Sequence, residues 1–142
     1  MNNTTFIEKA FYGNTKKVSH GNLFKDSENN IYSYGYHYPL LFTASDNQHF
    51  AFVNTTGYSN STSKHIGKAK MAVGNDRLIC VELDGARLPL TIDAIHTMLG
   101  AKVVELKALM DSKKRKDTQV YRMLSMDYER VLTDYNKVKG QL

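Results

Sequence analysis

The residues best suited to chemistry lie between Gly57 and Lys68. This stretch joins a glycine turn and several hydroxyl residues to Ser63, Lys64 and His65. If a helix begins here, its first N–H groups and the positive end of its dipole attract an anion, and the side chains add donors. The stretch therefore predicts a phosphate site at Ser63, Lys64 and His65, with Lys68 also facing the ligand.

A simpler interpretation of the same stretch stays open. Ser61 or Thr62 would cap the helix in the ordinary way, and Lys64 would extend into solvent. The two interpretations differ in whether the N–H groups at the helix start bind a ligand or only a capping hydroxyl.

Four alternating tyrosines form the second candidate feature. A strand from Ile31 would place Tyr32, Tyr34, Tyr36 and Tyr38 on one face and His37 on the other. Exposed tyrosine rings near cations suit stacking on a nucleobase, although such a face is often half-buried core. On this hypothesis Tyr36 and His37, together with Tyr58 nearer the helix, contact the ligand.

Motifs for catalysis are lacking. The sequence has no His-Glu-x-x-His, no Gly-x-x-x-x-Gly-Lys-Ser/Thr and no Gly-x-Ser-x-Gly. Cys80 lies in an apolar run, where a thiol is usually an inert core residue, and no two histidines have metal-ligand spacing on a helix. We expect no catalysis, no metal and no cofactor.

Composition favours one globular domain over residues 1–142, a length that can bury a substantial core. The single cysteine requires no oxidising compartment, and no apolar run is long enough to cross a membrane. A cytoplasmic protein without membrane contact is expected. The net charge of +5 is spread along the chain, and nucleic acid is an improbable partner.

The order of the expected strands and helices, which must position these residues, predicts an α+β fold. Twelve of the fifteen aromatic residues precede residue 75, which indicates a β-rich part over 1–90 and a helical part over 91–142. We expect an antiparallel meander that includes a strand over Lys16 to Lys25, and a strand over Leu78 to Leu83. Asp84-Gly85 predicts a tight turn into a returning strand through Leu90.

Three helices are expected. A short one runs over Ser61 to Gly74, and Gly67 weakens it. Two long ones follow, the first capped by Thr91, and pair as an antiparallel hairpin around a loop that holds Lys113 to Lys116. Their apolar surface exceeds what a small sheet can hide, which predicts a homo-oligomer formed through these helices.

Three blocks of the sequence resemble small proteins of tailed bacteriophages. They are Phe11-Tyr12-Gly13-Asn14, the Tyr-Ser-Tyr segment of Tyr32 to Leu40, and the Tyr-Ser-x-Thr-x-Lys-His block of Tyr58 to Ile66. In architecture the chain is also similar to phage anti-Thoeris proteins, which sequester cyclic ADP-ribose-type signals at a homo-oligomer interface. The resemblance implies a viral counter-defence protein in the host cytoplasm.

Two functions follow as hypotheses. In the first, the protein binds and sequesters a nucleotide immune signal without turning it over. In the second, it is an anti-CRISPR-like inhibitor that binds a bacterial host complex through its tyrosines or helices. Weak nucleic-acid binding through Lys113 to Lys116 and Arg122 is a third interpretation, and it predicts strong salt dependence.

Overall fold

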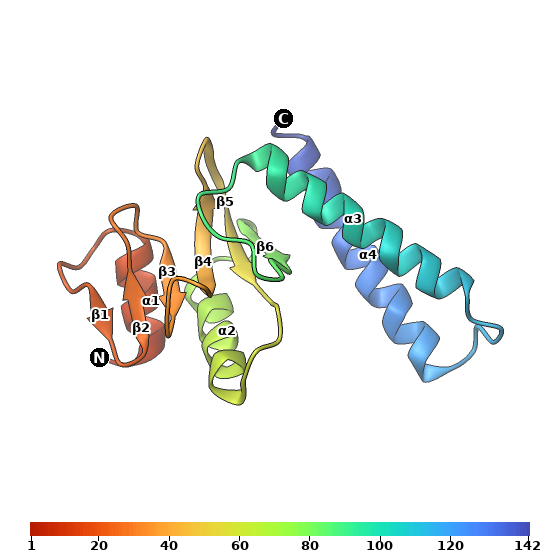
Figure 1. Ribbon diagram of the computed structural model, residues 1–142, viewed down its shortest axis with the longest axis horizontal. Helices are drawn as coiled ribbons and strands as arrows, with labels where there is room; N and C mark the ends of the chain where they lie inside the picture. Colours follow the sequence, from red (N-terminus) through yellow and green to blue (C-terminus); the bar gives the residue numbers. More distant parts are fainter. The chain divides into compact units, whose positions relative to one another are not determined.

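A computed structural model describes all residues 1–142, and the chain forms two compact units, Met1–Thr91 and Ile92–Leu142. The first unit is a six-stranded sheet with two helices, and the second is a pair of helices (Figure 1). The fold is α+β, as predicted. The boundary between the units lies beside the one expected between the β-rich and helical parts.

The sheet follows chain order, β1-β2-β3-β4-β5-β6. Its strands are β1 (Ser19–His20), β2 (Leu23–Lys25), β3 (Ile31–Ser33), β4 (Pro39–Ala44), β5 (Asn47–Asn54) and β6 (Leu78–Val81). The first five pair antiparallel, which confirms the meander. β6 instead pairs parallel to β5, because helix α2 carries the chain back before β6 begins.

Two helices, α1 (Asn3–Phe11) and α2 (Asn60–Ala72), pack together against the sheet. They share one core with the strands, built around Phe6, Ile7, Leu41 and Val53. α1 was not expected from the sequence, although its apolar residues recur at helical spacing. Asn2 caps it, because the Asn2 Oδ1 atom accepts a hydrogen bond from the Thr5 amide at 2.8 Å.

The strand predicted over Lys16 to Lys25 is wrong. The structure has two strands there, β1 and β2, which pair with each other as a hairpin. The reversal is at Gly21, whose φ of +60° is a left-handed conformation that glycine adopts without steric cost.

The prediction of one strand with four tyrosines on one face is also wrong. β3 ends at Ser33, and the chain turns over the next residues before Pro39 begins β4. Tyr34 has a φ of +69°, which breaks the alternation of the strand. Tyr32 and Tyr38 are consequently buried, while Tyr34 and Tyr36 project from the turn at 46% and 61% exposure.

The strand predicted to return after Asp84-Gly85 does not form. Both residues adopt the positive φ values of a turn, +48° and +90°, as their types suggested. However, the chain beyond them has no strand partner. It is instead tied to the β4–β5 turn, where the Ser45 amide donates to the Leu90 carbonyl oxygen at 2.9 Å.

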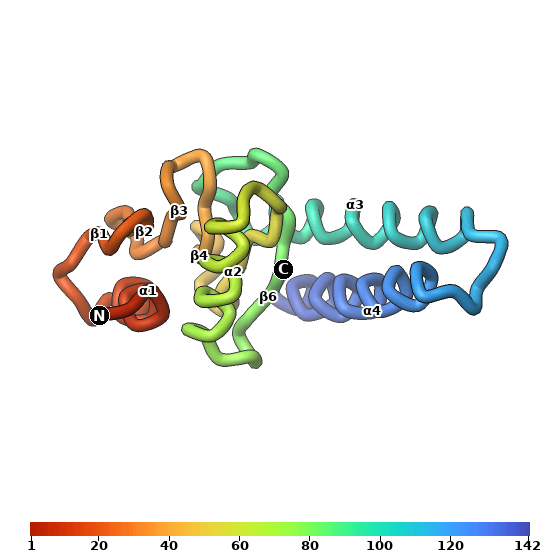
Figure 2. Tube along the Cα trace, turned by 90° about the horizontal axis from the view of Figure 1, so that it is seen from below, coloured from red at the N-terminus to blue at the C-terminus, as the bar shows by residue number.

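The second unit is the predicted antiparallel hairpin. Helices α3 (Ile92–Asp111) and α4 (Gln119–Lys139) lie side by side in both views of the chain (Figures 1 and 2). α3 begins directly after Thr91, and Lys113 to Lys116 lie in the connecting loop, as expected. None of the helices combines the length and the apolar character that a membrane span requires.

Candidate functional site

Four aromatic side chains from two segments of the first unit form the candidate site. Tyr34 and His37 come from the β3–β4 turn, while Tyr58 and His65 come from the start of α2 and the residues before it. The Tyr34 and His65 ring centroids are 5.7 Å apart, and those of His37 and Tyr58 are 5.5 Å apart. We call this group the tyrosine-histidine cluster.

Tyr38 anchors the Tyr58 side of the cluster. Its single hydroxyl proton is directed to the Thr56 carbonyl oxygen at 2.6 Å and shared with that of Asn54 at 3.2 Å, and its ring contacts Tyr58. Burial raises the pKa of Tyr38 to about 12, so this phenol stays a donor at any physiological pH. Tyr38 thereby fixes the residues that lead to Tyr58.

His65 forms the base of the cluster rather than its outer surface. It is buried, and its Nδ1 atom is hydrogen-bonded to Ser33 Oγ at 2.7 Å. Burial lowers the pKa of the imidazole below its usual range, so the ring is neutral at pH 7. His65 therefore offers a ring face toward Tyr34 and no positive charge for a phosphate.

The start of α2 is capped from within the chain. Ser59, and not Ser61 or Thr62, is the cap: its Oγ accepts from the Thr62 amide at 3.1 Å and donates to Thr62 Oγ1 at 3.0 Å. The Ser63 amide makes an ordinary helical bond to the Ser59 carbonyl oxygen. The capping interpretation therefore accounts for the amides of Thr62 and Ser63.

The other predicted site residues divide into two groups. Ser63, Lys64 and Lys68 are exposed on α2, next to the tyrosine-histidine cluster along the chain. Tyr36 is exposed but lies elsewhere, because its ring packs edge-on against Phe24 and Tyr32, both 5.0 Å away. The structure thus pairs His37 with Tyr58, places His65 against Tyr34, and leaves Tyr36 out.

The segments that carry the cluster have more lysines than carboxylates. Between residues 29 and 75 the chain carries one carboxylate, Asp46, whereas α2 alone carries Lys64, Lys68 and Lys70. No acidic residue lies on α2 or in the β3–β4 turn. These two segments therefore offer ammonium groups and no carboxylate to an anion. Asp84 is the acidic residue tied to the chain before Tyr58, because its amide donates to Thr56 Oγ1 at 3.0 Å.

Three residues that build the site were not among those predicted for it. Ser33 fixes His65, Tyr34 covers its ring, and Ser59 caps the helix. The spacing of Ser59 three residues before Thr62 was a readable cap signal. The pairing of Ser33 with His65 depends on how α2 packs on the sheet, and the sequence carries no local sign of it.

The arrangement suits binding. Exposed rings offer flat apolar faces, and the neighbouring ammonium groups offer charge. Nowhere in the chain do three or more His, Cys, Asp or Glu side chains gather as a metal site would need. No family model, curated protein or solved structure matches this chain.

Proposed function

We propose that the protein binds a nucleotide at the tyrosine-histidine cluster and holds it without turnover. The observation that carries the proposal is that the exposed Tyr34 and Tyr58 rings, paired with His65 and His37, belong to or contact the segment of α2, which carries lysines and no carboxylate. A base would stack on the rings, and a phosphate would pair with Lys64 or Lys68. Side-chain ammonium groups replace the helix amides in this role.

The biological role proposed with it is sequestration of a nucleotide immune signal of the cyclic ADP-ribose type by a phage protein. Sequestration requires affinity and no chemistry, so rings and cations suffice. The bacteriophage-like blocks of the sequence favour this setting, and two of them, Tyr32 to Leu40 and Tyr58 to Ile66, contain all four cluster residues.

Calorimetry against cyclic ADP-ribose isomers and cyclic oligonucleotides tests the proposal. Tyr58→Ala should weaken binding of the responding nucleotide at least about five-fold, because base stacking contributes about 1–3 kcal/mol. Met71→Ala is the matched control, since Met71 is a large exposed side chain on the same helix, 71% exposed. Lys64→Ala with Lys68→Ala should weaken binding and flatten its salt dependence, while Lys9→Ala should not.

Absence of heat with every phosphorylated ligand would reject nucleotide binding. Equal affinity of the wild type and the Tyr58→Ala variant would reject this site for it. Either result would be interpretable, because the Tyr58 and Met71 side chains are exposed and their replacement by alanine should leave the fold intact.

A protein target is the second candidate function, and the exposed tyrosines favour it. Tyr34, Tyr36 and Tyr58 are 46–63% exposed, and tyrosine is enriched where protein interfaces are strongest. A pull-down from bacterial lysate separates the two functions. One stoichiometric protein partner that is lost with Tyr58→Ala indicates an inhibitor of a host complex, whereas retention of a small molecule indicates sequestration.

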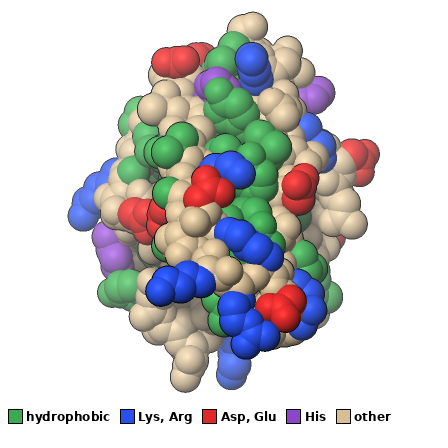
Figure 3. Space-filling model, turned by 90° about the vertical axis from the view of Figure 1, so that its right-hand side faces the viewer, with side chains coloured by type: hydrophobic (Ala, Val, Ile, Leu, Met, Phe, Trp, Pro, Cys, Tyr) green, Lys and Arg blue, Asp and Glu red, His purple; other side chains and the backbone are tan.

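The proposal includes a homo-oligomer formed through α3 and α4. These helices expose large apolar side chains, namely Val104, Leu109, Val120, Met123 and Met126. Figure 3 shows hydrophobic side chains gathered on the face it presents, among lysines, arginines and carboxylates. Buried residues of α4 all lie in its second half, from Val131 onward, which leaves the first half free to pack on another copy.

A further inference from the structure

A cavity at the other side of the first unit has no part in the nucleotide proposal. It measures about 450 Å³. Its lining comes from the β2–β3 turn, the β4–β5 turn and the segment after β6, and includes Asp26, Glu28, Tyr32, Ser45 and Leu88. None of these residues belongs to the tyrosine-histidine cluster.

The charge of this cavity is opposite to that of the whole chain. The protein has a net charge of +5, and residues 1–74 hold only four carboxylates. Two of the four, Asp26 and Glu28, line the cavity, and no lysine or arginine does. The remaining polar side chains, such as Ser45 and Thr43, offer oxygen atoms that accept hydrogen bonds.

Asp26 holds the cavity wall rigid. Its Oδ1 accepts from the amides of Glu28 at 2.9 Å and Asn30 at 3.0 Å. Its Oδ2 accepts from Asn30 Nδ2 at 3.2 Å and from the Tyr32 hydroxyl at 2.9 Å. Burial, followed by this hydrogen bond, raises the pKa of Tyr32, so the phenol remains a donor and the turn keeps its shape.

Of the two cavity carboxylates, that of Glu28 is available to bind a ligand. Its amide is tied to Asp26, but its side chain is exposed and forms no ion pair or hydrogen bond. The same cavity is also lined by apolar side chains, namely Ala44, Leu88 and Pro89, and by the ring of Tyr32. A lining that combines a carboxylate with apolar side chains matches a cationic head carried on an aliphatic stem.

A second cavity of about 380 Å³ adjoins the first and sets the direction of a ligand. The two share Glu28, Thr43 and Gln48 in their linings. Arg77 lines the second one, with its guanidinium 5.8 Å from the Tyr12 ring centroid and donating to the Gln48 and His49 carbonyl oxygens. The positive charge of Arg77 repels a cation, so the cationic head stays in the first cavity, whose charged lining residues are Asp26 and Glu28.

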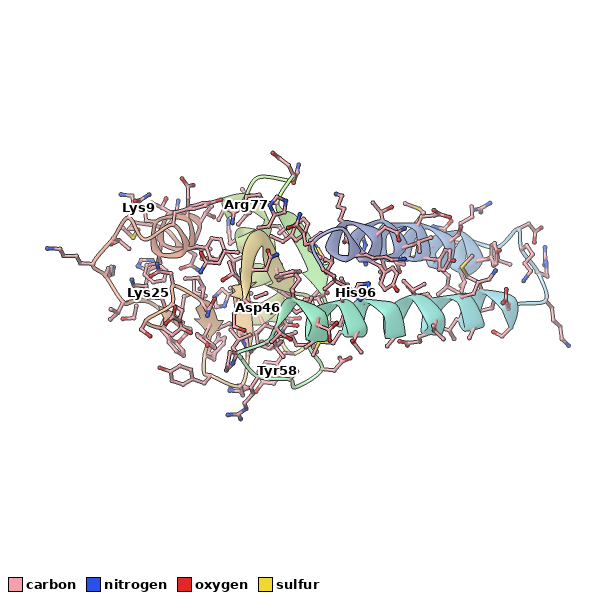
Figure 4. The ribbon with its side chains drawn as sticks, turned by 90° about the horizontal axis from the view of Figure 1, so that it is seen from above. Lys9, Lys25, Asp46, Tyr58, Arg77 and His96 are labelled. Atoms are coloured by element: carbon pink, nitrogen blue, oxygen red, sulfur yellow. The ribbon has the colours of Figure 1, made fainter.

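We propose that the cavity of Asp26, Glu28, Tyr32, Leu88 and Pro89 binds a primary amine or guanidinium group on a short aliphatic stem. The group comes from a free amine or from a lysine or arginine side chain of a partner. No residue that lines the cavity belongs to the tyrosine-histidine cluster, and Figure 4 shows Arg77 of the adjoining cavity on the side of the first unit opposite Tyr58. Failure of the amine proposal would leave the nucleotide proposal unaffected, and the reverse also holds.

NMR titration of the full chain tests the cavity, with n-butylamine as the probe and n-butanol as its neutral counterpart. Butylamine should shift the amide signals of Glu28, Asn30 and Ser45, and butanol at the same concentration should not. Glu28→Gln should weaken butylamine binding at least five-fold. Glu129→Gln, the same chemical change on exposed α4, should leave binding as in the wild type.

Equal shifts with butanol and butylamine, or unchanged butylamine binding in Glu28→Gln, would overturn the proposal. A short amidated peptide, Gly-Lys-Gly, identifies the source of the cation. At least ten-fold tighter binding than butylamine assigns the site to a protein side chain, and binding no tighter than butylamine assigns it to a free amine. Both of these results require that the amine itself binds, which the first titration decides.

Discussion

His65 shows that a residue type and its sequence neighbours can predict the wrong role for a single position. Its place beside Lys64 suggested a phosphate donor, but it lies under Tyr34 and bonds to Ser33. A histidine buried as the neutral form destabilises the fold when it must take up a proton. Protonation of His65 should therefore change the stability of the fold, and the residue has no role in phosphate binding.

The pH dependence of unfolding checks this assignment. Burial lowers the folded-state pKa of His65 below 6.5, so below pH 6.5 the unfolded chain binds more protons than the folded one. The stability contributed by neutral His65 is complete above pH 6.5 and is lost as the pH falls toward the folded-state pKa. Urea unfolding at pH 7 and pH 5 should show a smaller loss in His65→Asn than in the wild type. An equal loss in both would contradict the prediction.

His96 presents a different case, a buried nitrogen without a partner. Its ring stacks on Tyr135 with centroids 4.3 Å apart, and its Nε2 atom is buried and makes no hydrogen bond. Because an unpaired buried polar atom costs about 1–3 kcal/mol, His96→Phe should raise the free energy of unfolding by about 1 kcal/mol. Thermal unfolding measures this, with His49→Phe at an exposed position as the control. A Tm of His96→Phe below that of the wild type would contradict the prediction and show that Nε2 stabilises the fold.

At the scale of elements, two helical glycines predict opposite behaviour. Gly67 lies on the exposed side of α2, and a Cβ there would meet nothing within 4 Å. Gly67→Ala should therefore raise the free energy of unfolding by about 0.5–1 kcal/mol. A Cβ on Gly100 of α3 would lie 3.1 Å from Tyr135 Cε2, so Gly100→Ala should gain less or lose stability. Urea unfolding of both variants would contradict this if Gly100→Ala gained as much as Gly67→Ala.

The elements that the sequence predicts well are those with long periodic patterns. α3, α4 and the core of α2 were found because apolar residues recur over several turns, and the meander because turn residues separate its strands. α1 was missed because only nine residues carry its pattern. The Tyr32 to Tyr38 strand failed because a positive φ at Tyr34 is set by tertiary packing, which period 2 does not reveal.

The candidate site was less predictable than the fold. The sequence pointed to the right segment, from Tyr58 to Lys68, because hydroxyl residues and lysines gather there. It could not show that the β3–β4 turn brings Tyr34 to His65 and His37 to Tyr58. Those contacts join residues some twenty to thirty positions apart, and only the packing of α2 on the sheet determines them.

At the scale of the whole molecule, the exposed apolar side chains of α3 and α4 lead to the oligomer prediction. Light scattering at micromolar concentration should report at least a dimer. Met123→Glu with Met126→Glu should shift it toward monomer, because both side chains are more than half exposed and two charges would face the partner. Met71→Glu on α2 is the control. A wild-type monomer would contradict the prediction.

The parallel pairing of β5 and β6 has a consequence during synthesis on the ribosome. β6 cannot join the sheet until α2 and the residues after it have been made, so β5 leaves the tunnel with one bare edge. That strand carries Phe50, Phe52 and Val53, a segment able to recruit a neighbouring nascent chain. Translation that stalls just after α2 should therefore release aggregating fragments, whereas a stall beyond Val81 should not.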